Sequence, residues 1–150
     1  MKEVGLHYIA FGVEAGNYRV LKRLKKGEDM QAIEKAVSEA CDLGYKVTLF
    51  FLLGSPDETK ADVEDSVTLA LRYPVYDARF YNLIPFPGTE LYDWVVTNHY
   101  FVEQQAGYEY LNDASHWVNT PISKPPSCRQ RNARGSISGP TPWFSDTLQW

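Results

Sequence analysis

The chain has 150 residues, a formal net charge of −4 at pH 7 and 44% hydrophobic residues. This length suits one domain with a real core, and the negative charge argues against a nucleic-acid-binding surface. No run approaches the roughly 18 apolar residues that a membrane span needs, and residues 1–5 lack the apolar segment of a signal peptide, so we expect a cytoplasmic protein.

The first residues predict the end of a helix that is capped by Gly5 and followed directly by a strand. We therefore expect the chain to begin in the middle of a fold. Residues 8–14, Tyr-Ile-Ala-Phe-Gly-Val-Glu, are apolar, β-branched and aromatic, which predicts a strand buried on both faces.

This strand ends on Glu14, a carboxylate that lies between Gly12 and Gly16. A short helix is expected over residues 18–24, ending near Gly27. In parallel α/β proteins, ligands bind where strands end, and glycines let a ligand approach the backbone closely. Glu14 therefore lies where chemistry is usually done.

A second helix is predicted after Asp29 and before Gly44 by an apolar stripe with helical spacing; its members are Ala32, Ile33, Ala36, Val37 and Ala40. Residues 46–53 predict a second buried strand. The turn at residues 54–59 then leads to a helix with Asp62 and Glu64 in its first turns, followed by an apolar group; this group is Val63, Val67, Leu69, Ala70 and Leu71.

Residues 73–76 interrupt that helix, and residues 78–84 predict a third strand. A rigid loop at residues 85–89 precedes a helix that contains Leu91, Trp94 and Val95. Strands and helices that alternate at this spacing predict an α/β fold with a parallel sheet and right-handed crossovers. Three such βα units make half of a TIM-like barrel or a small open sheet.

The character of the sequence changes near residue 120. Residues 121–150 are rich in Pro, Ser, Gly and Arg and have no periodicity, so we expect an irregular tail that is disordered or loosely packed. A reading-frame error or a chimeric end is one hypothesis for it. We therefore divide the chain into a folded part, 1–120, and a tail, 121–150.

Three segments are similar to the radical SAM superfamily, in the order and at the spacing of that family. Residues 11–17, Phe-Gly-Val-Glu-Ala-Gly-Asn, resemble the fourth strand of the subgroup named B12-binding-domain radical SAM proteins, although Ala15 stands where serine is usual. Residues 50–59, Phe-Phe-Leu-Leu-Gly-Ser-Pro-Asp-Glu-Thr, and residues 80–92, from Phe-Tyr-Asn-Leu-Ile-Pro-Phe-Pro-Gly-Thr onward, continue the likeness. The resemblance covers about residues 2–120 and implies the second half of a radical SAM partial barrel.

The resemblance implies that Glu14, flanked by Gly16, binds the ribose or methionine part of S-adenosylmethionine (SAM). A carboxylate suits hydroxyl and ammonium donors because it offers only acceptors. The alternative is a structural glutamate that caps the next helix or pairs with Arg19. The resemblance also implies that Lys26 meets the methionine carboxylate, and the alternative is that it belongs to an exposed basic helix face.

The apolar end of the second strand, with Leu52 before Gly54, resembles the family's adenine-packing strand, although such residues are more often plain core. Asp57 stands where glycine is usual, so we expect this loop to be less free to adopt positive φ. After the third strand, the backbone at Ile84 and Pro85 is implied to hydrogen-bond adenine.

The same resemblance implies that Tyr81, Asn82 and Phe86 face the substrate. The alternative for this third loop is a stiff turn whose Thr89 caps the next helix, and both can hold at once.

The family also needs a [4Fe-4S] cluster held by three cysteines, and this chain has no such loop. Cys41 and Cys128 are too few and too far apart for a metal site or a disulfide framework, and Cys41 is expected to be a buried thiol. His7, His99 and His116 have no ligand spacing. We therefore expect no metal site here, and cluster ligands outside this chain.

The resulting prediction is a fragment of a radical SAM oxidoreductase or transferase that is inactive alone and needs the missing half of the barrel. SAM is its expected ligand, and cobalamin is a further cofactor that the parent could carry. Two alternatives stay open. One is a non-catalytic α/β module that binds a nucleotide-like ligand, or a partner chain at an exposed sheet edge; the other is a fragment of an iron-free TIM-barrel lyase.

Overall fold

The computed structural model describes residues 2–101. His116, Cys128, the boundary near residue 120 and the irregular tail at 121–150 lie outside these residues, so those predictions stay predictions. The elements, in chain order, are a 3₁₀ turn η1 (Lys2–Val4), β1 (Tyr8–Glu14), α1 (Tyr18–Arg23), α2 (Met30–Asp42), β2 (Lys46–Leu53), α3 (Lys60–Arg72), β3 (Asp77–Asn82) and α4 (Glu90–Thr97).

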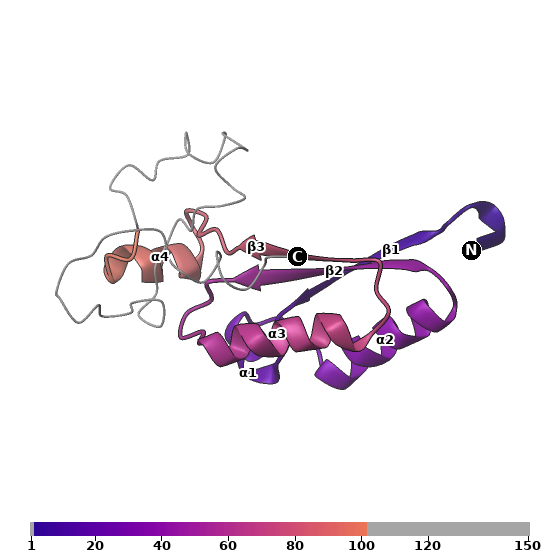
Figure 1. Ribbon diagram of the computed structural model, residues 1–150. Helices are drawn as coiled ribbons and strands as arrows, with labels where there is room; N and C mark the ends of the chain where they lie inside the picture. Colours follow the sequence, from indigo (N-terminus) through magenta and orange to yellow (C-terminus); the bar gives the residue numbers. More distant parts are fainter. Residues whose placement is uncertain (1, 102–150) are drawn as a thin grey trace.

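The three strands form one parallel sheet in the order β1-β2-β3. Figure 1 shows α1, α2 and α3 on one side of this sheet and α4 beyond the carboxyl ends of β2 and β3. The predicted α/β fold with a parallel sheet is therefore confirmed, and its βα units are consistent with those of a TIM-like barrel. Because all three strands run the same way, the loops that follow them leave the sheet at the same edge.

Local sequence explains where most of these elements begin and end. Asn17 caps α1 because its side chain accepts a hydrogen bond from the Val20 amide. Gly44, just beyond the end of α2, has φ 71°, a left-handed conformation that glycine adopts without steric cost. Thr89 caps α4 by accepting from the Tyr92 amide, as predicted for the third loop.

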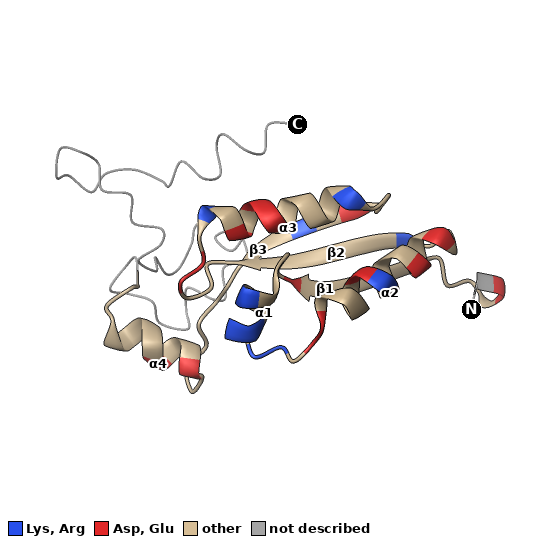
Figure 2. Ribbon diagram, turned by 90° about the horizontal axis from the view of Figure 1, so that it is seen from below, with Lys and Arg blue, Asp and Glu red and all other residues tan. Residues whose placement is uncertain are grey.

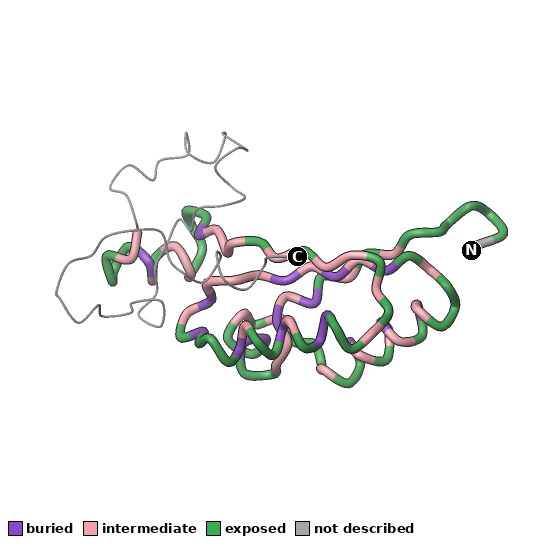
Figure 3. Tube along the Cα trace, in the orientation of Figure 1, coloured by how far each residue is buried: buried purple, intermediate pink, exposed green. Residues whose placement is uncertain are grey.

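The core lies between the sheet and the three helices that cover it (Figure 3). On β2 the buried residues are Val47, Leu49 and Phe51, which alternate with less buried ones. From α2, Ile33, Val37 and Ala40 pack into the same core, while Ala32 of the predicted stripe is exposed.

The prediction that β1 is buried on both faces is wrong. Along this strand Tyr8, Ala10 and Gly12 are exposed, whereas Val13 is fully buried. The helices cover only one face of the sheet, and among the described residues no helix covers the other (Figure 1). An apolar run therefore indicated the strand correctly but could not indicate how many layers pack on it.

Other expectations need smaller corrections. The predicted helix end at residues 1–5 is a single 3₁₀ turn, although Gly5 does have a positive φ of 90°. The third strand ends at Asn82, so Leu83 and Ile84 belong to the loop. Leu71, a member of the apolar group on α3, is exposed. Cys41, expected to be buried, is only partly so, and burial raises the pKa of its thiol.

None of the helices within residues 2–101 is long and apolar enough to cross a membrane.

Candidate functional site

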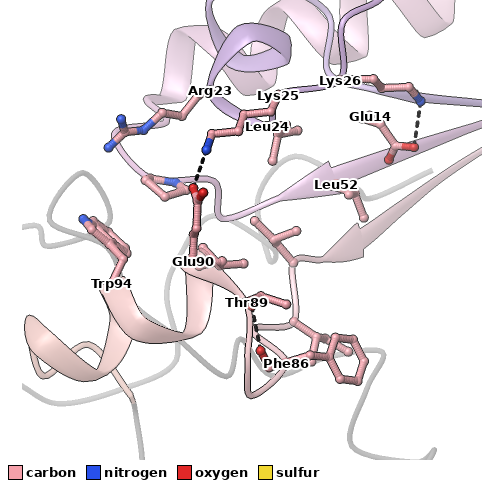
Figure 4. A pocket seen from close by; sticks show the side chains of 14 residues that line it. Glu14, Arg23, Leu24, Lys25, Lys26, Leu52, Phe86, Thr89, Glu90 and Trp94 are labelled. Atoms are coloured by element: carbon pink, nitrogen blue, oxygen red, sulfur yellow. Dashed lines mark hydrogen bonds and ion pairs between the residues drawn. The ribbon is translucent and has the colours of Figure 1, made fainter.

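A cavity of about 700 Å³ opens where the three strands end. This volume lies in the range of pockets that bind small molecules and cofactors. Its walls come from the ends of β1 and β2, the segment after α1, the loop after β3, and α4 (Figure 4). The lining residues are Glu14, Arg23, Leu24, Lys25, Lys26, Leu52, Pro56, Leu83, Ile84, Phe86, Thr89, Glu90, Leu91 and Trp94.

The polar end of the cavity is the ion pair of Glu14 and Lys26. Lys26 Nζ lies 2.9 Å from Glu14 Oε1 and also donates to the Gly12 carbonyl. The side chains are 24% and 19% exposed, so the pair is partly shielded from water but still reachable. Arg19, the partner considered from sequence, pairs with Asp62 instead.

The backbone explains how Glu14 reaches this position. The β1–β2 register shifts between Gly12 and Glu14, as in a β-bulge. Glu14 itself has φ 68°, a left-handed conformation that is uncommon for residues other than glycine. A Cβ on Gly12 would lie 2.7 Å from Glu14 Oε1. Glycine at position 12 therefore leaves the room that the folded-back carboxylate occupies.

An apolar wall lies beside this ion pair. Leu52 from the end of β2, Leu83 and Ile84 from the loop after β3, and Leu24 from the end of α1 line the cavity. Leu52 and Ile84 were predicted to face a ligand, and the structure brings both to the same cavity as Glu14. A partly buried apolar surface next to a charged pair can hold a ligand that has one flat apolar part and one charged part.

The outer end of the cavity is formed by α1 and α4. Lys25 pairs with Glu90 in the first turn of α4, and Trp94 lies one turn further along that helix (Figure 4). Figure 2 shows the basic residues of α1 and the acidic start of α4 at the same end of the sheet. Sequence reasoning placed Leu91 and Trp94 only on a helix. Their spacing of three residues indicated a shared face, but nothing local indicated that α4 covers the cavity.

Of the ten predicted site residues, Glu14, Lys26, Leu52, Ile84 and Phe86 line the cavity. The other five do not line it. Gly16 packs against α3, where an added Cβ would be 2.3 Å from the Ser66 amide nitrogen. Tyr81 lies on the uncovered face of the sheet, with its ring centroid 5.8 Å from that of Phe50. Three residues remain. The amide of Gly54 donates to Glu58. Asn82 is partly buried at the end of β3, and Pro85 is buried.

One buried carboxylate, Glu58, lies in the loop after β2, and a second, Asp62, lies in the first turn of α3; no local pattern indicated that they form a pair. Glu58 is 5% exposed and accepts hydrogen bonds from the amides of Gly54 and Ser55. Burial raises the pKa of Glu58, and these two hydrogen bonds only partly oppose the rise. In the same loop Asp57 has φ 62°, so the expectation that aspartate would restrict positive φ here is wrong; aspartate tolerates this conformation better than most residues.

Asp62 has the opposite balance. It is 6% exposed, and burial by itself would raise its pKa. Hydrogen bonds from Thr59, Arg19 and Asn17 outweigh burial and hold the pKa of Asp62 well below its usual range. Asp62 accepts from the Thr59 amide at 2.7 Å, as in a capping box at the start of α3.

The described residues do not supply a metal centre. No group of three or more His, Cys, Asp or Glu side chains within residues 2–101 could hold a metal ion. Cys41, the cysteine within this range, is on α2. The whole sequence has two cysteines, whereas an open [4Fe-4S] site of the kind expected needs three. The chain's own donor set therefore does not fit that cluster.

Comparison with known proteins connects this geometry to a family. The family model described as the radical SAM superfamily matches residues 1–70. Three curated proteins are similar to the chain. An uncharacterized methyltransferase of Pyrococcus horikoshii is 35% identical over 98 residues, which are 65% of this chain and 21% of that protein.

A protein of Methanocaldococcus jannaschii named a methylthiotransferase is 29% identical over 97 residues, or 65% of this chain and 22% of its own length. A cytidylyl-2-hydroxyethylphosphonate methyltransferase of Streptomyces wedmorensis is 31% identical over 98 residues, or 61% of this chain and 18% of its own length. The chain thus spans about a fifth of the length of these relatives.

Proposed function

Because residues 1–70 belong to the radical SAM superfamily, we propose that this chain is the SAM-binding half of a radical SAM enzyme. The observation that carries the proposal is the ion pair of Glu14 and Lys26, held 2.9 Å apart at one end of a cavity with an apolar wall. SAM has a zwitterionic amino-acid part and a flat purine, so its two ends match the two ends of this cavity.

In the proposed complex, Glu14 accepts hydrogen bonds from the ammonium or ribose hydroxyl groups of SAM, and Lys26 donates to its carboxylate. In the free protein the two side chains neutralise each other. On binding, the ammonium group of SAM would replace Lys26 as the charged partner of Glu14, and the carboxylate of SAM would replace Glu14 as the partner of Lys26. The left-handed φ of Glu14 agrees with this role, because strained backbone conformations cluster at ligand sites.

The purine would lie against Leu52 and Ile84, with the backbone at Ile84 and Pro85 offering hydrogen bonds to its edge. Phe86, at the cavity, and Tyr81 and Asn82, at the end of β3, are proposed to face the substrate. We also propose that Gly16 and Gly54 lie in the two loops beside the ligand, although both have the structural contacts described above.

The reductive cleavage of SAM belongs to a [4Fe-4S] cluster, and this chain does not supply that cluster's ligands. We propose that they lie in a further part of a longer protein, which would complete the barrel. The named activities of the relatives favour transfer of a methyl or methylthio group as the class of reaction, with cobalamin a further cofactor of the parent. The proposed setting is the cytoplasm.

The test is SAM binding to the purified chain by calorimetry, with the Glu14→Ala variant alongside. Loss of a charge-assisted hydrogen bond from a partly buried site should weaken binding roughly tenfold or more. Glu28→Ala is the matched control, because Glu28 also lies near Lys26, at 3.7 Å, but is half exposed and outside the cavity lining. This variant should bind SAM as the unmodified chain does.

Binding that Glu14→Ala leaves unchanged would contradict the assignment of Glu14. A folded chain that does not bind SAM at all would contradict the proposal that this half carries a binding site of its own.

A non-catalytic module that pairs with a partner chain is the second candidate. It is favoured by one observation, namely that β1 and β3 each pair with only one neighbour in the described sheet. Sedimentation over a range of concentrations, with and without SAM, would distinguish the two. Association that is independent of SAM, by a chain that does not bind SAM, would favour the second candidate.

A further inference from the structure

The loop between β1 and α1 is attached to α3 by three hydrogen bonds. The Gly16 amide donates to Ser66 Oγ at 2.8 Å. The Asn17 side-chain amide donates to Asp62 Oδ1 and to Asp65 Oδ2, each at 2.8 Å. These contacts join residues more than 40 positions apart in the sequence, so they fix one loop of the candidate site to a helix that does not line the cavity.

The two backbones also approach each other closely at this point. A Cβ on Gly16 would lie 2.3 Å from the Ser66 amide nitrogen and 2.5 Å from the Asp65 carbonyl oxygen. Glycine at position 16 therefore lets the loop lie directly on the helix. Ser66 is 1% exposed, and its hydroxyl both accepts from Gly16 and donates to the Asp62 carbonyl at 3.1 Å.

Asp62 makes this attachment rigid. Its carboxylate accepts from Arg19 and Thr59 as well as from Asn17, so α1, the loop and the first turn of α3 share one buried acceptor. Figure 1 shows α1 and α3 on the same side of the sheet. The buried face of α3 is polar at Asp62 and Ser66 and apolar further along, at Leu69 and Ala70.

Glu14 is two residues before Gly16. The residue between them, Ala15, is buried, and its amide donates to the Val13 carbonyl at 2.9 Å. With Gly16 fixed on α3 and Val13 fixed in the core, the intervening backbone has little freedom, and Glu14 takes φ 68°. The direction of its carboxylate therefore depends on where α3 holds the loop.

We propose that Ser66 is a positioning residue that acts through Gly16 to hold the Glu14 carboxylate at the cavity. This inference rests on the proposed SAM site. It adds that part of the affinity for SAM depends on a buried hydroxyl on α3 that does not line the cavity.

A double-mutant cycle on SAM affinity tests it, using calorimetry on the purified chain with Ser66→Ala, Glu14→Ala and the double variant. Ser66→Ala should weaken binding roughly three- to tenfold. If Ser66 acts through Glu14, the double variant should bind no more weakly than Glu14→Ala alone, because coupled residues are not additive. Losses that multiply, or an unchanged affinity in Ser66→Ala, would overturn the inference and leave the proposed function standing.

Thr68→Ala is the matched control. The Thr68 hydroxyl donates to the carbonyl four residues earlier, as that of Ser66 does, but Thr68 is exposed and this bond stays within α3. Asp65→Asn is a second test variant, since Asp65 is exposed, contacts Asn17 and is outside the buried core. Thr68→Ala should leave SAM affinity unchanged, and Asp65→Asn should weaken it less than Ser66→Ala.

A second readout does not need SAM. By NMR, Ser66→Ala should speed hydrogen exchange of the Gly16 amide roughly tenfold or more and change the Glu14 amide–Hα coupling constant, which depends on φ. Thr68→Ala should change neither. If the unmodified chain fails to bind SAM, the proposed function fails, and this readout still decides the inference. Exchange and coupling that stay the same in Ser66→Ala would overturn it.

Discussion

Two buried carboxylates, one just before α3 and one in its first turn, show how neighbouring groups decide the pKa of a buried acid. Glu58 and Asp62 are four residues apart and similarly buried, yet their pKa values shift in opposite directions. Glu58 receives two backbone amides and has one oxygen, Oε1, without a hydrogen-bond partner among the described residues. Asp62 receives a guanidinium, a hydroxyl and two further donors. Burial therefore dominates at Glu58, and hydrogen bonding dominates at Asp62.

The raised pKa of Glu58 predicts a pH dependence of stability. Because the folded state holds this proton more tightly than the unfolded state, the stabilisation is complete below the ordinary glutamate pKa of about 4.3 and is lost as pH rises through the folded pKa. Glu58→Gln should remove this part of the dependence, since glutamine keeps an acceptor oxygen for Gly54 and Ser55. Urea unfolding at several pH values between 4 and 7 measures it.

The control for this experiment is Glu64→Gln, because Glu64 is exposed on α3 and pairs with exposed Lys60 in an i, i+4 arrangement. The free energy of unfolding of the unmodified chain, minus that of Glu58→Gln, should be more positive at pH 4 than at pH 7. A constant difference over this range would contradict the prediction.

At the scale of elements, β2 is the strand that organises the sheet, because it pairs with both β1 and β3. Its two faces differ. Phe51 is fully buried, and its ring stacks on that of Phe80, with centroids 4.8 Å apart. The adjacent Phe50 is only partly buried, because it lies on the face that no described helix covers. Phe50 and Phe51 should therefore contribute differently to the free energy of unfolding.

This difference can be measured with two single variants. Phe51→Ala should reduce the free energy of unfolding by about 3–5 kcal/mol, since it leaves a cavity in the core. Phe50→Ala, the matched control on the same strand, should cost less than about 2 kcal/mol, because its side chain is partly in water already. Chemical unfolding monitored by circular dichroism gives both values. Equal losses would show that the second face is also covered in solution.

At the scale of the whole molecule, the described fold is a one-sided α/β layer. The core joins the three strands with α1, α2 and α3, and its buried cluster includes no residue of α4. Lys25, in the segment after α1, pairs with Glu90 of α4, and both side chains are mostly exposed. Exposed ion pairs contribute little to stability. We therefore expect α4, whose residues lie outside this cluster, to be attached more weakly than the helices that cover the sheet.

Hydrogen exchange should report this arrangement. Amides of β2 should exchange slowest, because they bond to both neighbouring strands and open only with the whole core. Amides of α4 should exchange faster, through local opening, and SAM should slow them if it binds in the cavity. Mass spectrometry of peptides from the two elements measures both rates. Protection of α4 equal to that of β2 without ligand would contradict the prediction.

The sequence by itself determined the elements and their order. The apolar runs at residues 8–14 and 46–53, the stripe in α2 and the cap at Thr89 are local patterns, and each reports the structure of its own segment. Alternation of strands and helices then required a parallel sheet, and parallel strands end at one edge. For that reason Glu14, Leu52 and Ile84 could be expected at one site before the structure was known.

Only the tertiary structure decided which side chains meet. The pairing of Glu14 with Lys26, of Arg19 with Asp62 and of Gly16 with Ser66 depends on how loops and helices pack across the sheet. The same packing placed Trp94 beside the cavity and left one face of β1 exposed. Local patterns cannot encode these outcomes, because a contact between distant residues depends on the geometry of everything folded between them.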